Sequence, residues 1–218
     1  MTTAQKIAVL DTETSGLPLY KERSTDPAQP HLVELAVKLF ASDGTELERF
    51  AAIIKPDGWL IHDDVAAIHG ITQERAMDEG IPEAEAIEAF LALHNQSQLR
   101  VAHNVSFDDR IMRIALLRYL GEADAEAYKA HPTFCTANES RSILKLPPSE
   151  AQKAKTSFKT RTPTLAEAYE FFTGEKLEEA HRAEPDAEAC ARIYFTMTAL
   201  REGAELIADH QAREAAKA

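Results

Sequence analysis

Apolar residues in the first quarter of the chain stand in short, nearly unbroken runs, a pattern typical of buried β-strands. Three such runs predict strands at residues 7–10, 32–40 and 49–56. A polar segment with three prolines separates the first two runs, and Asp43 followed by Gly44, which favours a tight hairpin turn, separates the last two. The short connections predict an antiparallel meander of three strands.

The pattern then changes to a helical period, with apolar residues three and four positions apart. Helices are predicted at residues 82–94, 106–121, 162–174 and 184–202, and short strands at 99–104 and 133–140. Ser106 is the expected N-cap of the second helix. Three strands followed by alternating strands and helices predict an α/β domain over residues 1–202. We expect the charged, alanine-rich tail at 203–218 to form a peripheral helix.

Composition narrows the classes of function. The chain has 36 Asp and Glu residues against 24 Lys and Arg residues, a formal net charge of −12, so it has no general attraction to polyanions or anionic membranes. No apolar run approaches the ~20 residues of a membrane span, and no signal-peptide pattern is present. With only Cys135 and Cys190, we expect two reduced thiols in a cytoplasmic protein with no membrane partner.

One segment reverses the acidic balance. Residues 141–161 contain six basic residues and a single acidic one, Glu150. Two interpretations are open: a solvated loop, or a surface that contacts the phosphates of a substrate. In the second case Lys153 and Lys155 are candidate substrate-binding residues.

Two carboxylates follow the first strand directly. Side chains alternate between the faces of a strand, so Asp11 and Glu13 are expected to point the same way, with Thr12 opposite. Neighbouring carboxylates repel each other unless a cation lies between them, and hard oxygen ligands favour Mg²⁺ or Mn²⁺. On its own, this pair is also common on solvated strand ends.

Two further stretches add titratable groups. Asp108 lies in the opening turn of a predicted helix that follows a strand, and Asp186 lies in the first turn of another, five residues after His181. In an α/β sheet, strand ends and the starts of the following helices gather at one edge. The sequence therefore predicts that four carboxylates and one imidazole converge there.

Three motifs run through these residues: D-x-E-T-x-G at 11–16, H-N-x-x-F-D at 103–108 and H-x-A-x-x-D-A at 181–187. In this order they resemble the DnaQ-like 3′→5′ exonucleases of the DEDDh type, within the ribonuclease-H-like superfamily. The segment I-H-G-I-T at 68–72 also matches the family. The resemblance implies a mixed sheet, in which parallel strands extend the antiparallel meander, flanked by helices.

The resemblance implies a role for each acidic residue. Asp11 would bridge two divalent cations, Mg²⁺ or Mn²⁺, with Glu13 and Asp186 completing one site and Asp108 holding the second ion. Such a pair of cations stabilises the attacking and leaving oxygens of a phosphoryl displacement. His181 would be the general base, because an imidazole titrates near neutral pH.

The resemblance also implies substrate contacts. Candidates for binding the terminal nucleotide are Thr14, Leu17, His69, Asn104 and Phe107. Simple core packing is an equal interpretation for Leu17 and Phe107. Asp109 stands next to Asp108, and we assign the metal-binding role to Asp108 because it directly follows Phe107, as the motif requires. His103 is expected to be structural.

The favoured hypothesis is a metal-dependent 3′→5′ exonuclease that releases nucleoside 5′-monophosphates from single-stranded nucleic acid, with DNA preferred. It would act on 3′ ends alone or with a polymerase or other replication or repair partner. Trimming of RNA or of very short oligonucleotides is the main alternative. A catalytically silent binding module and a phosphodiesterase for small esters are weaker ones. The sequence gives no indication of oligomeric state.

Overall fold

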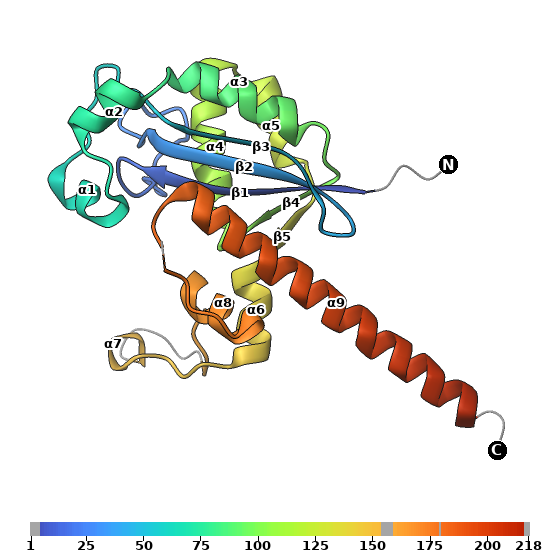
Figure 1. Ribbon diagram of the computed structural model, residues 1–218. Coiled ribbons are helices and arrows are strands. Elements are labelled where there is room, and N and C mark those ends of the chain that lie inside the picture. Colours follow the sequence, from blue (N-terminus) through green and yellow to red (C-terminus); the bar gives the residue numbers. More distant parts are fainter. Residues whose placement is uncertain (1–4, 154–158, 179, 216–218) are drawn as a thin grey trace.

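The computed structural model describes residues 5–153, 159–178 and 180–215. Among these residues, five strands form one mixed sheet in the order β3-β2-β1-β4-β5 (Figure 1). The strands are β1 (Lys6–Thr14), β2 (Leu32–Ala41), β3 (Glu46–Ile53), β4 (Leu99–Ala102) and β5 (Thr133–Cys135). β2 is antiparallel to both β1 and β3, whereas β4 is parallel to both β1 and β5. The α/β class and the mixed sheet are thus confirmed.

Helices cover both faces of the sheet. They are α1 (Asp63–His69), α2 (Gln73–Glu79), α3 (Glu83–His94), α4 (Val105–Tyr119), α5 (Glu122–Lys129), α6 (Thr136–Leu144), α7 (Glu150–Lys153), α8 (Leu165–Thr173) and α9 (Ala183–Ala215). On one face, α3, α4 and α5 pack over Ala8 and Leu10 of β1. On the other, α9 packs over Ile7 and Val9, with Cys190 at the contact. The alternation along β1 therefore assigns each of its side chains to a face.

Burial explains why β2 reads as an almost continuous apolar run. Nine of its ten residues are buried, because helices lie on both faces and strands on both sides. β3, at the edge of the sheet, has four exposed residues among its eight. Two charged residues, Glu34 and Lys38, are buried within β2, so each requires a partner of opposite charge.

Some sequence predictions are wrong in detail. Residues 133–140 do not form one strand: β5 ends at Cys135, whose sulfur accepts a hydrogen bond from the Asn138 backbone and caps α6. Ser106 is not the N-cap of α4. Asn104 takes that position with a left-handed backbone (φ 71°), and Ser106 lies in the first turn, where its hydroxyl donates to Asn104 Oδ1 at 3.2 Å.

α9 is one continuous helix from Ala183 to Ala215, and its C-terminal half extends beyond the sheet (Figure 1). The division at residue 203 predicted from composition falls inside this helix and stays a prediction. Within the described residues, no helix is both long enough and apolar enough to cross a membrane.

Candidate active site

Asp11 and Glu13 extend from the C-terminal half of β1. Ile7 and Val9 face α9, so the alternation of the strand places Asp11 and Glu13 on the α9 side of the sheet. Pairing between β1 and β4 ends at Val9 and Val101, and β4 itself ends at Ala102. The last residues of β1 therefore extend beyond β4, next to the first turn of α4.

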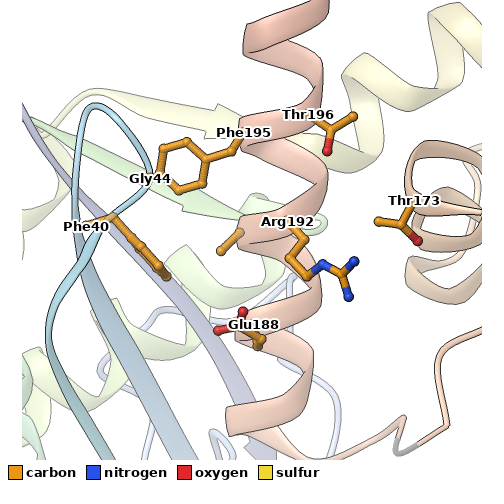
Figure 2. A pocket seen from close by; sticks show the side chains of 8 residues that line it. Phe40, Gly44, Thr173, Glu188, Arg192, Phe195 and Thr196 are labelled. Carbon is orange, nitrogen blue, oxygen red and sulfur yellow. The ribbon is translucent and has the colours of Figure 1, made fainter. Parts of the chain in front are cut away.

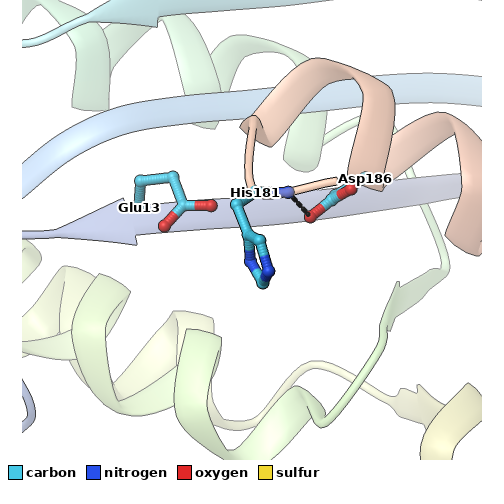
Figure 3. A group of neighbouring side chains, drawn as sticks. All are labelled: Glu13, His181 and Asp186. Carbon is cyan, nitrogen blue, oxygen red and sulfur yellow. Dashed lines mark hydrogen bonds between the residues drawn. The ribbon is translucent and has the colours of Figure 1, made fainter. Parts of the chain in front are cut away.

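His181 and Asp186 come to Glu13 from the start of α9. The backbone of His181 is left-handed (φ 69°), and its N–H donates to Asp186 Oδ2 at 3.0 Å (Figure 3). Each of the three side chains offers a ligand atom, and these atoms all lie within 4.8 Å of one another. Two motifs more than 160 residues apart in the sequence thus meet at one point.

Asp108 reaches the cluster from the opposite face of the sheet. It is buried in the first turn of α4, and its Oδ1 accepts a hydrogen bond of 2.9 Å from the Thr12 hydroxyl. Its charge acts on Asp11, whose pKa it raises. Asp109 points elsewhere: its carboxylate pairs with the guanidinium of Arg100 at 2.8 Å. Asp108, and not Asp109, therefore adjoins the end of β1.

The negative charges of the cluster are not balanced by its cationic neighbours, so the carboxylates of Asp11 and Glu13 are harder to ionise. Burial, followed by the charges of Asp108, Asp186 and Glu13, raises the pKa of Asp11 well above its ordinary value. Burial and the neighbouring carboxylates raise the pKa of Glu13 to about 7. Carboxylates held in this state are neutralised either by protons or by a bound cation.

The pKa values of the other two carboxylates rise mainly through burial. Burial raises the pKa of Asp108 to about 8, against the lowering effect of the Thr12 hydroxyl. It raises that of Asp186 to about 6, against the His181 N–H. Among the described residues, Asp186 Oδ1 is buried without a hydrogen-bond partner. Hard oxygen donors, shared negative charge and this unpaired atom fit a divalent cation.

Glu34 belongs to the site, although the sequence motifs do not include it. It lies directly opposite Glu13 in the β1–β2 register and is almost fully buried. Its Oε1 accepts from Arg182 Nη2 at 2.7 Å, and its Oε2 accepts from Arg182 Nε at 3.0 Å and from the Ala183 backbone at 2.9 Å. A glutamate within a continuous apolar run was the available signal, because a buried carboxylate needs a partner.

The candidate nucleotide-binding residues are placed less uniformly. Leu17 and Asn104 are exposed, and Phe107 is half-buried against the core under α4. Thr14 is buried, and its hydroxyl donates to the Gly16 carbonyl at 2.8 Å. His69 is only 2% exposed, and its Nδ1 accepts from the Ile71 backbone, so its ring does not present an open stacking surface.

The histidine and lysine candidates outside the cluster differ in their contacts and in their exposure to solvent. The ring of His103 bonds to Thr136 Oγ1 and to the Pro163 carbonyl, a structural arrangement. Lys153 is exposed on α7 and forms an ion pair of 2.6 Å with Glu150. Lys155 lies outside the described residues.

A separate hollow of about 430 Å³ lies between α9, the end of α8 and the β2–β3 hairpin (Figure 2). Phe40, which lines it, pairs with Ile7 at the opposite end of β1 from the carboxylates. Arg192, which also lines it, is paired with Glu175 at 2.8 Å. The hollow is therefore distinct from the acidic cluster.

A mixed sheet of this order, with carboxylates at the end of its central strand, defines the ribonuclease-H-like class of nucleases. The chain belongs to the exonuclease family RNase_T of that class, whose model matches residues 8–194. The resemblance to DnaQ-like 3′→5′ exonucleases that the three motifs indicate is thereby confirmed.

Individual relatives agree with this family. The chain is 34% identical over 119 residues to the PolC-type DNA polymerase III of Thermotoga petrophila, a match that spans 52% of this chain and 7% of the polymerase. Two solved structures are E. coli exonuclease I with a dT13 oligonucleotide (TM-score 0.69, 19% identity, 88% of this chain and 40% of that one) and its zinc-bound complex with single-stranded DNA (TM-score 0.69, 19% identity, 92% and 42%). This likeness shows the fold.

Proposed function

We propose that this protein is a metal-dependent 3′→5′ exonuclease that hydrolyses single-stranded DNA and releases nucleoside 5′-monophosphates. The observation that carries the proposal is the meeting of Asp11, Glu13, Asp186 and Asp108 at the C-terminal end of β1. Burial raises the pKa values of all four, and neighbouring members of the cluster raise those of Asp11 and Glu13 further. Membership of the exonuclease family supports the reaction. The single-stranded DNA in the exonuclease I complex supports the substrate class.

Two divalent cations, Mg²⁺ or Mn²⁺, fit the donor set. Asp11, Glu13 and Asp186 would hold one, and Asp11 with Asp108 the other. Once bound, such cations neutralise the phosphate oxygens and stabilise both the attacking and the departing oxygen. Zinc in the exonuclease I complex supports a divalent ion, and the all-carboxylate donor set favours the harder Mg²⁺ or Mn²⁺.

His181 is the proposed general base. Its imidazole is exposed on the side where Glu13 and Asp186 meet, and its backbone N–H orients the Asp186 carboxylate (Figure 3). The ring would accept the proton of the attacking water and release it to solvent after the bond is broken. Imidazoles perform this task well because they titrate near neutral pH.

Substrate contacts would come from the rim of the site. We assign the terminal nucleotide to Leu17, Asn104 and Phe107, which surround the start of α4 and the end of β1, and the phosphates to the basic segment with Lys153. Binding only the 3′ end of a nucleic acid strand requires few basic side chains, which suits a chain of net charge −12. Similarity to a PolC-type polymerase supports a replication or repair partner, and the two unpaired cysteines support the cytoplasm.

The test uses 5′-labelled DNA and RNA, single- and double-stranded, with Mg²⁺, Mn²⁺ or a chelator. We expect a ladder shortened from the 3′ end on single-stranded DNA with either metal, and no cleavage with the chelator. Asp186→Asn is the matched inactive control. Equal cleavage by this variant, or no cleavage by the wild type with any metal, would refute the proposal. Faster cleavage of RNA would identify an exoribonuclease instead.

A further inference from the structure

Three apolar side chains are exposed within four residues of the loop that follows β1. Leu17, Leu19 and Tyr20 are 77%, 40% and 66% exposed. Isolated apolar residues are common on protein surfaces, but a group beside a candidate active site indicates a contact surface. Tyr20 is seven residues from Glu13, so the chain places it within at most ~25 Å of the carboxylates.

The exposure of these side chains is fixed by their backbone. Gln29 is 2% exposed, and its side-chain amide pairs with both backbone groups of Leu19: Nε2 donates to the carbonyl and Oε1 accepts from the N–H, each at 3.0 Å. The same amide donates to the Arg23 carbonyl at 3.0 Å. Arg110 of α4 donates to the Glu22 carbonyl at 2.8 Å. The loop therefore has a defined shape despite its prolines.

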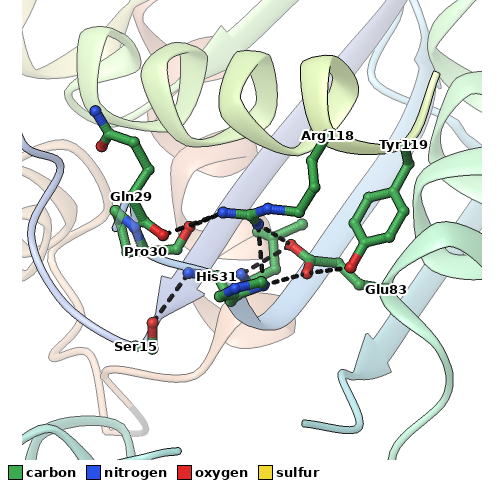
Figure 4. Close-up of polar contacts among 8 residues, drawn as sticks. Ser15, Gln29, Pro30, His31, Glu83, Arg118 and Tyr119 are labelled. Atoms are coloured by element: carbon green, nitrogen blue, oxygen red, sulfur yellow. Dashed lines mark hydrogen bonds and ion pairs between the residues drawn. The ribbon is translucent and has the colours of Figure 1, made fainter. Parts of the chain in front are cut away.

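The two ends of the loop are fastened to the body. Ser15 and His31 pair through the Ser15 N–H and through the Ser15 hydroxyl, at 3.0 and 2.9 Å (Figure 4). Arg118 donates to the carbonyls of Gln29 and Pro30, while the buried carboxylate of Glu83 lies 2.7 Å from the His31 ring. These contacts explain why the loop does not collapse over its own apolar side chains.

We propose that Leu19 and Tyr20 form a stacking platform for the bases of single-stranded DNA upstream of the nucleotide that is cleaved. This inference rests on the proposed function and deepens it. An aromatic ring accepts any base on its face, and Lys21 and Arg23, both exposed, flank the platform with cations for the backbone. Because the loop is already ordered, little conformational entropy is lost when a strand binds.

The platform has a defined kinetic consequence. In this proposal Tyr20 contacts bases and not the reacting phosphate, so it would contribute to substrate binding and not to the chemical step. Its contribution should appear only with substrates long enough to place a base on it. A dinucleotide, which occupies the catalytic edge alone, does not use the platform, whereas an oligonucleotide of about eight residues does.

Tyr20→Ala tests the platform, with Tyr20→Phe as the variant that keeps the ring and Leu47→Ala as a control for loss of an exposed apolar side chain on β3. We expect Tyr20→Ala to raise KM for (dT)8 about five- to hundredfold, with kcat and the KM for a dinucleotide unchanged. Tyr20→Phe and Leu47→Ala should match the wild type. Equal KM values for Tyr20→Ala and the wild type on (dT)8 would overturn the inference while leaving the exonuclease in place.

A binding measurement separates this inference from the proposed function. Fluorescence anisotropy of labelled (dT)8 with Asp186→Asn reports affinity without turnover, and adding Tyr20→Ala should raise Kd by the same factor. If the wild type cleaves nothing but the Kd difference persists, the platform stands and the reaction is wrong. If Kd does not change with Tyr20, a base-stacking role is refuted, and the exposed residues serve another partner.

Discussion

Glu34 and Arg182 form a two-pronged ion pair directly beside the acidic cluster, with Glu34 opposite Glu13 in the sheet. Within the pair, the charge of Glu34 raises the pKa of Glu13, and the charge of Arg182 partly offsets that effect. It also attaches the segment that carries His181, and the first N–H of α9, to β2 near the start of that strand. Glu34 is thus a positioning residue for the third motif.

Removing this attachment should loosen the general base. Glu34→Gln removes the carboxylate that accepts from Arg182 and from the Ala183 backbone N–H, so we expect a loss of about 2 kcal/mol in the free energy of unfolding, discounted for the partial exposure of Arg182. We also expect kcat to fall more than KM rises. Glu46→Gln, which alters an ion pair of Lys38 with a more exposed carboxylate, is the control. Urea denaturation and single-turnover rates give both quantities, and wild-type kcat in Glu34→Gln would contradict the positioning role.

Neutralising a metal ligand should abolish cleavage yet stabilise the protein without metal. The pKa of Asp186 is about 6 in the folded chain and near 4 when unfolded, so the stability of the metal-free protein should fall as pH rises from 4 through 6. Asp186→Asn removes the part of this dependence that Asp186 contributes and should be about 1–3 kcal/mol more stable at pH 8. Chelated samples denatured at pH 5 and pH 8 provide the comparison. A destabilised variant at pH 8 would show that Asp186 is a structural residue.

Replacing His181 should slow the reaction with little effect on binding. We expect His181→Asn to reduce kcat about 10²- to 10⁴-fold with KM nearly unchanged, because the variant loses the proton acceptor but tolerates the left-handed backbone. A variant with normal kcat across neutral pH would exclude His181 as the base.

The lysines of the basic segment should determine how strongly the binding of single-stranded DNA depends on salt concentration. Replacing Lys153 and Lys159 together by glutamine should weaken binding of single-stranded DNA and reduce the slope of log K against log salt by about one. Lys129→Gln, on α5, removes an exposed charge elsewhere and should leave the slope unchanged. Titrations of labelled oligonucleotide at several salt concentrations measure the slope. An unchanged slope in the double variant would assign these lysines to bulk solvent.

Periodicity predicts the elements whose burial is regular. β1, β2, α3 and α4 follow from apolar spacing, because each buries a face that the sequence repeats. The short helices α1 and α2 have seven residues each and little apolar repeat. α2 begins where the Thr72 hydroxyl accepts from the Arg75 backbone, a local signal that periodicity does not register.

The sequence predicted only those site residues that belong to a recognisable motif. The motif distinguishes Asp108 from Asp109, and the turn of α4 gives the reason: one carboxylate bonds to Thr12 and the other to Arg100. Glu34 stands out in the sequence only as a charge within an apolar run, and the β1–β2 register is what places it opposite Glu13. The burial of His69 depends on how α1 packs, and its own sequence does not reveal this.

The left-handed backbone at His181 limits which amino acids can replace it during evolution. A side chain and a positive φ are required at the same residue, and glycine, asparagine and aspartate are the replacements that accept such a backbone at low cost. Most other substitutions would disturb both the imidazole and the N–H that orients Asp186. A descendant that kept the fold but gave up catalysis would therefore be expected to carry one of these three amino acids there.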